Sequence, residues 1–296
     1  MTGPLTDLDL PGIWRDADAA SGQGQVWTLR YVRLRLVGCI VAALAAVLSF
    51  QIGQVDVAAI AILAGFTVAL LAEIAGWIHK PEALWHDGRA VAESAKTLAW
   101  RYAVGADPFP MDLDHAQAHE LLRRRLAEIS EEAAAHITIT APSPITTQGM
   151  QALRDTPFPA RRAAYIKGRT EDQHKWYAQK AVFNRARATG WRVALVAAEV
   201  MALVLASLRV FGNWQVDLAG LMAALIAAGG AWVAVKQYAS LAAAYSIAAM
   251  ERALQSDKLN DVSEADWPLV AADAEEAISR EHTMWLASRT GRRPKT

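Results

Sequence analysis

The sequence predicts an all-α integral membrane protein, with four transmembrane helices in two pseudo-repeated hairpins and a helical cytosolic region. Three observations lead to this fold class. The 296-residue chain is 53% hydrophobic and only 20% charged. Its apolar residues gather in four stretches that reach the roughly 20 residues needed to cross a bilayer. These stretches form two pairs, and a very short connection joins the members of each pair.

Composition also excludes several classes of protein. The 30 basic residues balance the 30 acidic ones, whereas a general nucleic-acid binder needs a basic excess. A single cysteine, Cys39, excludes a disulfide framework and a zinc site built from cysteines. We therefore expect no nucleic-acid partner.

The four predicted membrane helices cover about 36–55, 57–78, 193–211 and 218–235. The first and fourth contain no charged residue, the second contains Glu73, and the third contains Glu199 and Arg209. A core helix of a soluble protein rarely runs this far without a charged face. Both connections contain Gln-Val-Asp, at 54–56 and 215–217, which indicates an internal duplication.

The remaining chain is assigned to helices and one linker. Each repeat is expected to be a module made of one membrane hairpin and its cytosolic helices. The first module is expected at 1–136 and the second at 160–296. Between them, 137–159 is rich in Thr, Pro and Ser without a helical period and is predicted to be a linker. The fourth membrane helix meets no proline, so 218–254 is predicted as one rod. Asp112 or Asp114 is expected to cap a helix that reaches about 135, and Ser263 with Asp266 a helix over about 264–289.

The basic residues predict the orientation. All Lys and Arg except Arg209 lie outside the hairpin tips, on the side of both termini. The positive-inside rule therefore places both termini in the cytosol of a multi-pass inner (plasma) membrane protein.

Ionisable groups inside a membrane are costly and are candidates for function. Glu199, about 10 Å from the inner interface, has two readings: part of a cation pathway, or a structural carboxylate within the helix bundle. Glu73 also has two readings. Its copies from several subunits form a ring at the cytosolic mouth of a pore, or its side chain simply reaches the interface. Arg209 is read as a snorkelling anchor. Small residues such as Ala72, Gly76, Ala223, Ala227 and Ala231 favour close helix packing within or between subunits.

Outside the membrane, Arg89, Glu93 and Lys96 form a charged stripe on one helix face. Asp112, His115 and His119 also share a helix face, but they lack a third strong ligand, so no metal site is predicted. The chain contains no phosphate-binding glycine loop, nucleophile elbow or HExxH motif. We therefore expect neither an enzyme nor a cofactor.

Two stretches resemble a known family: WHDGRAVAESAKTLAWRYAVGADPF at 85–109 and AEEAISREHTMWLASR at 274–289. Both are similar to bacterial SLATT modules, two-helix membrane domains associated with nucleotide synthases and nucleotide sensors. The YSIAAME stretch at 245–251 resembles the segment that follows the hairpin in that family. We take Arg89, Glu93, Glu251 and Glu281 as candidates for cytosolic assembly or gating.

The resemblance implies a homo-oligomeric pore or ion channel. Such an effector would be gated by a nucleotide signal or a cytosolic sensor protein, and its other partners would be lipids and ions. The alternative is a membrane-anchored scaffold that recruits a cytosolic partner and does not conduct. A pore predicts that at least one of Glu73→Gln and Glu199→Gln alters conductance or ion preference, whereas a scaffold predicts that both substitutions leave activity unchanged.

Overall fold

The computed structural model describes residues 3–48, 51–52, 55–133, 144–212 and 218–290, and in the last helix it describes side chains only as far as Ile278. The chain folds as two units. The polar unit contains Met1–Gln25, Glu82–Gln179 and Tyr245–Thr296, and the membrane unit contains Val26–Pro81 and Lys180–Ala244. Each unit is therefore built from segments of both predicted modules.

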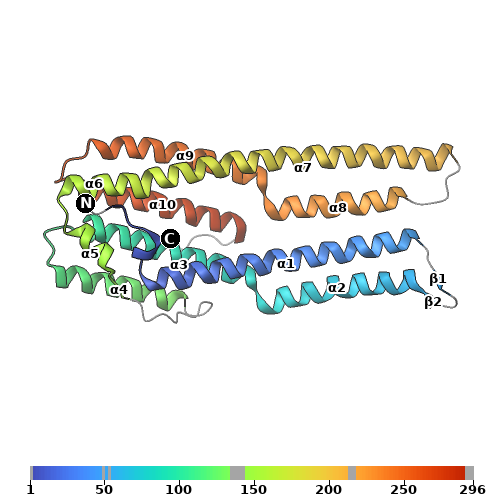
Figure 1. Cartoon of the computed structure of the whole chain (residues 1–296), viewed down its shortest axis with the longest axis horizontal. Coiled ribbons are helices and arrows are strands. Elements are labelled where there is room, and N and C mark those ends of the chain that lie inside the picture. Colours follow the sequence, from blue (N-terminus) through green and yellow to red (C-terminus); the bar gives the residue numbers. More distant parts are fainter. Residues whose placement is uncertain (1–2, 49–50, 53–54, 134–143, 213–217, 291–296) are drawn as a thin grey trace. The chain divides into compact units, whose positions relative to one another are not determined.

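The fold is helical, as predicted, and its described part contains four helices long and apolar enough to cross a bilayer (Figure 1). In the membrane unit, α1 (Gly12–Leu48) and α2 (Val57–His79) form the first hairpin, and α7 (Asp172–Phe211) and α8 (Leu218–Lys236) the second. Helix α1 ends before the predicted boundary at 55, because the tip forms a short ladder of β1 (Gln51–Ile52) and β2 (Val55–Asp56). Asp56 then caps α2 by accepting a hydrogen bond from the Ala59 amide.

Small residues let the helices of the first hairpin touch along their backbones. A Cβ atom added to Gly38 would lie 2.5 Å from the Gly65 carbonyl oxygen, and one added to Gly65 would lie 2.6 Å from the Gly38 carbonyl oxygen. Ala42 and Ala69 are buried beside this crossing. The predicted small-residue packing of Ala72 also occurs within this hairpin, where that side chain is buried.

The second hairpin is packed more openly. A Cβ atom added to Gly229 would lie 3.1 Å from Leu195, but one added to Gly230 would meet nothing within 4 Å. In the most apolar windows of the helices that contain α7 and α8, no residue is buried by the chain. Ala223 and Ala227 are exposed. This hairpin therefore presents a small-residue face that its own chain does not cover.

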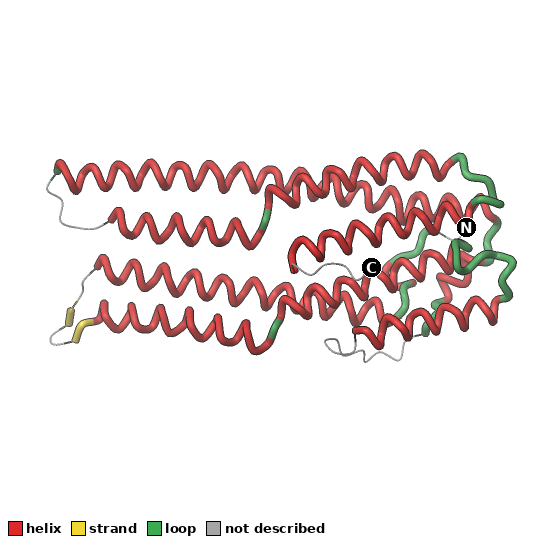
Figure 2. Tube along the Cα trace, turned by 180° about the vertical axis from the view of Figure 1, so that it is seen from behind, coloured by secondary structure: helices red, strands yellow, loops and turns green. Residues whose placement is uncertain are grey.

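The second helix of each hairpin is followed by a one-residue break, which Figure 2 shows as a short loop segment. Lys80 and Gln237 have φ angles of 44° and 50°, the only positive values at non-glycine residues in the described chain. The prediction of one rod over 218–254 is therefore wrong, since α8 ends at Lys236 and α9 (Tyr238–Asn260) begins after Gln237. In contrast, α7 continues without a break from Asp172 to Phe211.

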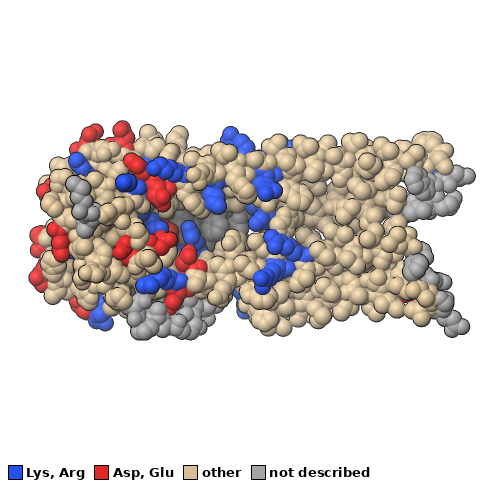
Figure 3. Space-filling model, in the orientation of Figure 1, with Lys and Arg blue, Asp and Glu red and all other residues tan. Residues whose placement is uncertain are grey.

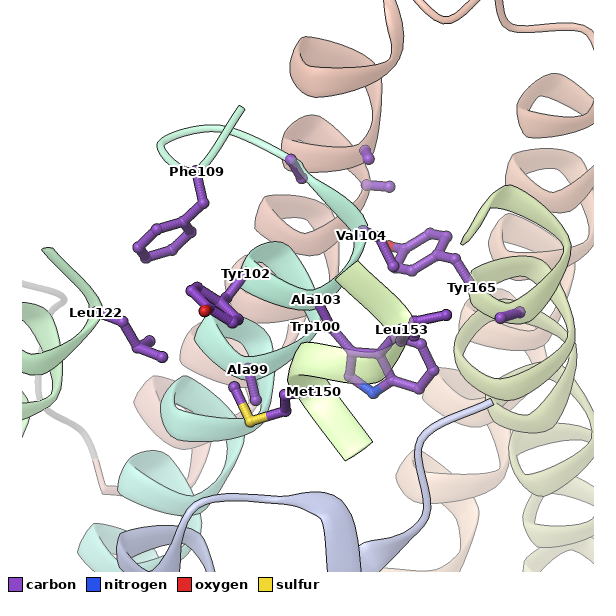
Figure 4. Close-up of a cluster of buried hydrophobic side chains, with 14 of the residues drawn as sticks. Ala99, Trp100, Tyr102, Ala103, Val104, Phe109, Leu122, Met150, Leu153 and Tyr165 are labelled. Carbon is purple, nitrogen blue, oxygen red and sulfur yellow. The ribbon is translucent and has the colours of Figure 1, made fainter. Parts of the chain in front are cut away.

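The polar unit packs around α3 (Pro81–Val104), whose buried face includes Ala95, Ala99 and Ala103. Its other elements are η1 (Asp7–Asp9), α4 (His115–Ala133), α5 (Gln148–Arg154), α6 (Phe158–Tyr165), η2 (Ile166–Glu171) and α10 (Trp267–Thr290), with the ends of α1, α7 and α9. Trp100 of α3 makes an edge-to-face contact with Tyr165, at 5.8 Å between ring centroids, and both side chains are completely buried (Figure 4).

Part of the predicted linker belongs to this core. Residues 137–143 of the predicted linker lie outside the described residues, but α5 follows as a regular helix. Thr147 caps it by accepting a hydrogen bond from the Met150 amide, and Met150 and Leu153 are completely buried. The helix was missed because seven residues are too few to show a helical period. Buried Arg154 holds α5 against the end of α3 by donating hydrogen bonds to the carbonyl oxygens of Tyr102 and Phe109, at 2.7 and 2.8 Å.

The predicted cap at Asp114 occurs, because its carboxylate accepts a hydrogen bond from the Ala116 amide at the start of α4. At the second predicted cap, the Asp266 amide donates to the Ser263 hydroxyl at 3.2 Å. These residues form a turn before α10, which begins at Trp267 and not at about 264.

Candidate functional site

The two carboxylates of the membrane helices lie in different environments. Glu73 of α2 forms an ion pair with Arg35 of α1 inside the first hairpin. The pair is partly exposed, with 42% of the Arg35 side chain and 58% of the Glu73 side chain accessible. Because Arg35 compensates its charge, Glu73 adds no net charge to that surface. This geometry suits a structural role within the hairpin.

Glu199 is exposed on α7 and has neither an ion-pair nor a hydrogen-bond partner among the described residues. It lies seven residues beyond Arg192, which corresponds to about 10 Å along the helix. Its neighbours Val196 and Val200 are more than half exposed. In a bilayer, a carboxylate at this place needs either water or a polar group from another chain. Arg209 lies exposed two residues before the end of α7, where a snorkelling anchor is expected.

The polar unit contains a buried charge network that we call the Arg169 cluster, formed by Glu93 and Thr97 of α3, Tyr165 of α6, Arg169 of η2 and Glu275 of α10. Arg169 and Glu275 are both completely buried. Arg169 donates to both oxygens of Glu275, from Nε at 2.9 Å and from Nη2 at 2.8 Å, and also to Glu93 at 2.8 Å. Tyr165 and Thr97 each donate a hydroxyl to Glu275 at 2.9 Å. Glu275 thus accepts four hydrogen bonds.

Charge compensation stabilises the charged forms of Glu93 and Arg169. Burial by itself raises the pKa of Glu93, but the charges of Arg169, Arg89 and Lys96 outweigh it and lower the pKa to about 2. Burial likewise disfavours the charged form of Arg169, yet the carboxylates of Glu275 and Glu93 raise the pKa of this guanidinium well above its ordinary value. Glu93 and Arg169 therefore remain ionised at any physiological pH.

Arg169 lies in a π-helical turn. The six residues of η2 interrupt an otherwise continuous helix that begins with α6 and continues through α7 into the membrane span. Single π-helical turns inside α-helices occur often at functional sites. Arg169, the cation of the cluster, therefore belongs to the same long helix, Phe158–Phe211, that contains Glu199 in its membrane span.

The candidate residues predicted in the polar region are only partly brought together. Arg89 lies 3.7 Å from Asp18 and 4.0 Å from Glu93, so Arg89 and Glu93 belong to the edge of the Arg169 cluster. Glu251 lies apart, half exposed and 3.9 Å from Arg252. Glu281 lies in the part of α10 whose side chains fall outside the described residues.

Sequence reasoning missed Arg169, Tyr165 and Glu275. A signal existed, because the stretch at 85–109 contains Glu93 and Thr97, and the stretch at 274–289 contains Glu275. The two stretches that carry the family resemblance therefore supply the partners of one buried arginine.

The histidines of α4 were considered as metal ligands. His115 lies 3.7 Å from Asp155, and both side chains are mostly exposed. Among the described residues, no group of three or more His, Cys, Asp or Glu is placed to hold a metal ion.

Comparison with known families gives two adjacent matches. Residues 11–162 match the family model of the SMODS and SLOG-associating 2TM effector domain 3, and residues 165–285 match that of the SMODS and SLOG-associating 2TM effector domain 1. Comparison with curated proteins and with solved structures gave no significant match. The first match covers more than half of the chain, and each match includes one of the two membrane hairpins. The chain is thus a multi-pass membrane protein with two effector domains in tandem, and it belongs to the SLATT family.

Proposed function

We propose that this membrane-associated effector is a homo-oligomeric pore, with Glu199 on the surface that faces the conduction path. The observation that carries the proposal is the exposed position of Glu199, on a span that its own chain leaves uncovered. An unpaired carboxylate at this depth would be costly against lipid tails. An assembly of several chains around a central axis removes that cost, because Glu199 then faces water.

The second hairpin supplies a surface for such an assembly. Ala223 and Ala227 are exposed at four-residue spacing on α8, and faces of this kind allow close helix approach in lipid. The first hairpin has already used its small residues between α1 and α2. We therefore assign the contacts between subunits to α8 of the second hairpin, whose other helix, α7, carries Glu199.

Gating belongs to the polar unit in this proposal. The Arg169 cluster joins α3, α10 and the helix that continues into the third span. A nucleotide or a sensor protein that changes the packing of these helices would act on the same continuous helix as Glu199. From the positive-inside rule, we place the chain in a bacterial inner membrane with both termini on the cytosolic side. We assign no catalytic step to the chain.

Single-channel recording of the purified chain in planar bilayers, under asymmetric salt, tests the proposal. We expect discrete conductance steps and a cation preference that Glu199→Gln weakens. Glu128→Gln is the matched control, because it removes a carboxylate from an exposed pair on α4 with Arg125. Glu73→Gln should leave the ion preference unchanged, since Glu73 is neutralised by Arg35.

Two outcomes would contradict the proposal. An unchanged reversal potential in Glu199→Gln would remove Glu199 from the conduction path. Silent bilayers from protein that is folded and oligomeric, with the polar unit intact, would favour the membrane-anchored scaffold.

A further inference from the structure

A short segment of the polar unit, residues 4–9, lies against both η2 and α5, and we call it the strap. A Cβ atom added to Gly168 of η2 would collide with the Cβ atom of Pro4. A Cβ atom added to Gly149 of α5 would collide with the carboxylate of Asp9. The absence of a side chain at these two glycines therefore provides the space in which the strap is seated.

The strap is anchored at its C-terminal end. Leu10, the next residue, is 1% exposed and belongs to the core of the polar unit. The Thr147 hydroxyl, at the start of α5, donates to the Asp9 carbonyl oxygen at 2.6 Å. Within the strap, the amide and the hydroxyl of Thr6 donate to the Asp9 carboxylate at 2.8 and 2.7 Å. The strap therefore has a shape of its own and can move as one piece about Leu10.

The rest of the strap is held by shallow contacts. Its 3₁₀ turn, η1, contains no buried residue, Leu8 is 80% exposed, and Leu5 packs against the core while only partly buried. Segments with few buried apolar contacts open locally at a small cost in free energy. Figure 3 shows that Asp, Glu, Lys and Arg side chains gather on the polar unit, whereas most of the membrane unit is uncharged. The strap can therefore open into water.

The strap covers the π-helical turn that carries the cation of the Arg169 cluster. Gly168 comes directly before Arg169 in η2. It lies between Pro4 of the strap and Trp100 of α3, since a Cβ atom added to Gly168 would also lie 3.1 Å from the Trp100 ring. A π-helical turn is a rare conformation, so contacts on both of its sides contribute to holding it. The strap supplies one of these two sides.

The strap also brings a charge close to the cluster. Burial and the charge of Arg169 lower the pKa of Lys96 on α3, whereas the carboxylates of Glu93 and Asp7 act in the opposite direction. Asp7 of the strap thus stabilises a cation that lies within electrostatic reach of the Arg169 cluster. Opening of the strap removes this compensation.

We propose that the strap is a latch on the polar unit. When it is seated, it holds η2 and the Arg169 cluster closed. When it opens about Leu10, both become looser while the core remains folded. A role of the latch in gating rests on the proposed function: the helix that contains η2 continues into the third span, so opening of the latch favours the conducting state of the pore.

Hydrogen exchange of the full chain in lipid nanodiscs tests the latch with substitutions that push the strap from either side. Gly149→Ala acts from α5, where the three atoms nearest to the added Cβ atom all belong to Asp9. Gly168→Ala acts from η2. Gly22→Ala is the matched control in the same unit, because nothing lies within 4 Å of its added Cβ atom.

We expect Gly149→Ala to raise the exchange rates of the strap and of η2 by about tenfold, the order of one lost hydrogen bond, although it changes no residue of η2. Gly168→Ala should have a similar effect. Adding Pro4→Gly to Gly168→Ala removes the colliding Cβ atom of Pro4 and should restore part of the protection. Peptides from α4 should keep their protection in every variant, and Gly22→Ala should leave the strap and η2 unchanged.

Three results would overturn the latch: an exposed strap with unchanged protection of η2, exposure of α4 to the same extent as η2, or an equal effect of Gly22→Ala. Single-channel recording tests the role in gating, where Gly149→Ala should raise the open probability severalfold relative to Gly22→Ala. An unchanged open probability in a variant whose strap is open would remove the strap from gating. Silent bilayers from the wild type and the variants alike would contradict the proposed pore, and hydrogen exchange would still decide whether the latch exists.

Discussion

Replacing Glu275 with glutamine removes one charge from the centre of the Arg169 cluster and keeps the shape of the side chain. An amide nitrogen cannot accept the hydrogen bonds that one carboxylate oxygen of Glu275 now receives from Arg169 and Thr97. The substitution also leaves the buried Arg169 cation with Glu93 as its main counter-charge. Breaking a buried ion pair by removing one partner costs about 3–5 kcal/mol. That is a large part of the 5–15 kcal/mol that stabilises a typical domain.

Hydrogen exchange of the full chain in lipid nanodiscs measures this loss where it occurs. Peptides from α3 should show a fall of about 3–5 kcal/mol in opening free energy, because α3 carries Glu93 and Thr97 in the cluster. Peptides from α2 serve as the internal reference. Glu128→Gln, which removes the same charge from an exposed pair, should cost less than about 1 kcal/mol.

A double variant separates lost charge compensation from lost packing. Arg169→Met combined with Glu275→Gln leaves no uncompensated buried cation, and the charges of Arg89 and Lys96 still compensate Glu93. The double variant should therefore regain part of the stability lost in Glu275→Gln. Unchanged protection of α3 in the single variant would refute the claim that this network holds the polar unit together. Equal loss in the single and double variants would show that packing, rather than charge, decides the effect.

Three further predictions concern other parts of the fold. The pKa of Glu93 is lowered from 4.5 to about 2. Its ionised form should therefore stabilise the fold by about 3 kcal/mol above pH 4.5, and this stabilisation should disappear as the pH falls through 2. Thermal unfolding between pH 5 and 2 should show this loss of stability, and the loss should be smaller in Glu93→Gln. Gly38→Ala should destabilise the first hairpin, because its Cβ would lie 2.5 Å from a carbonyl oxygen. Gly230→Ala should be neutral or stabilising by about 0.5–1 kcal/mol. SDS titrations should show a lowered unfolding midpoint for Gly38→Ala and an unchanged or raised one for Gly230→Ala. Gln237→Gly should stabilise the folded chain by roughly 1 kcal/mol, since glycine adopts the positive φ of this position without the steric cost of a side chain. A lowered unfolding midpoint in the same titration would contradict this prediction.

The membrane spans and helix caps could be predicted because their physical causes are local. An uncharged run of 20 residues and a serine three residues before an aspartate are both visible in the chain order. The stripe of Arg89, Glu93 and Lys96 was visible for the same reason. Its function was not, because Glu93 acquires its main partner, Arg169, only through tertiary folding. Sequence spacing shows which groups share a helix face, and a buried ion network depends on which faces meet.

The two breaks at Lys80 and Gln237 show a different limit of sequence reasoning. Both residues adopt a left-handed conformation that costs roughly 1–2 kcal/mol for any residue with a side chain. At Lys80 the sequence gives a local reason, because Pro81 disfavours the right-handed helical conformation of the residue before it. At Gln237 the next residue is Tyr238, which leaves that conformation open, and so a continuous rod was the natural prediction. The break after α8 is therefore imposed by the packing around it, where Tyr238 and Ala242 are buried. A change in that packing would allow α8 and α9 to become one helix, whereas Pro81 opposes the same change between α2 and α3.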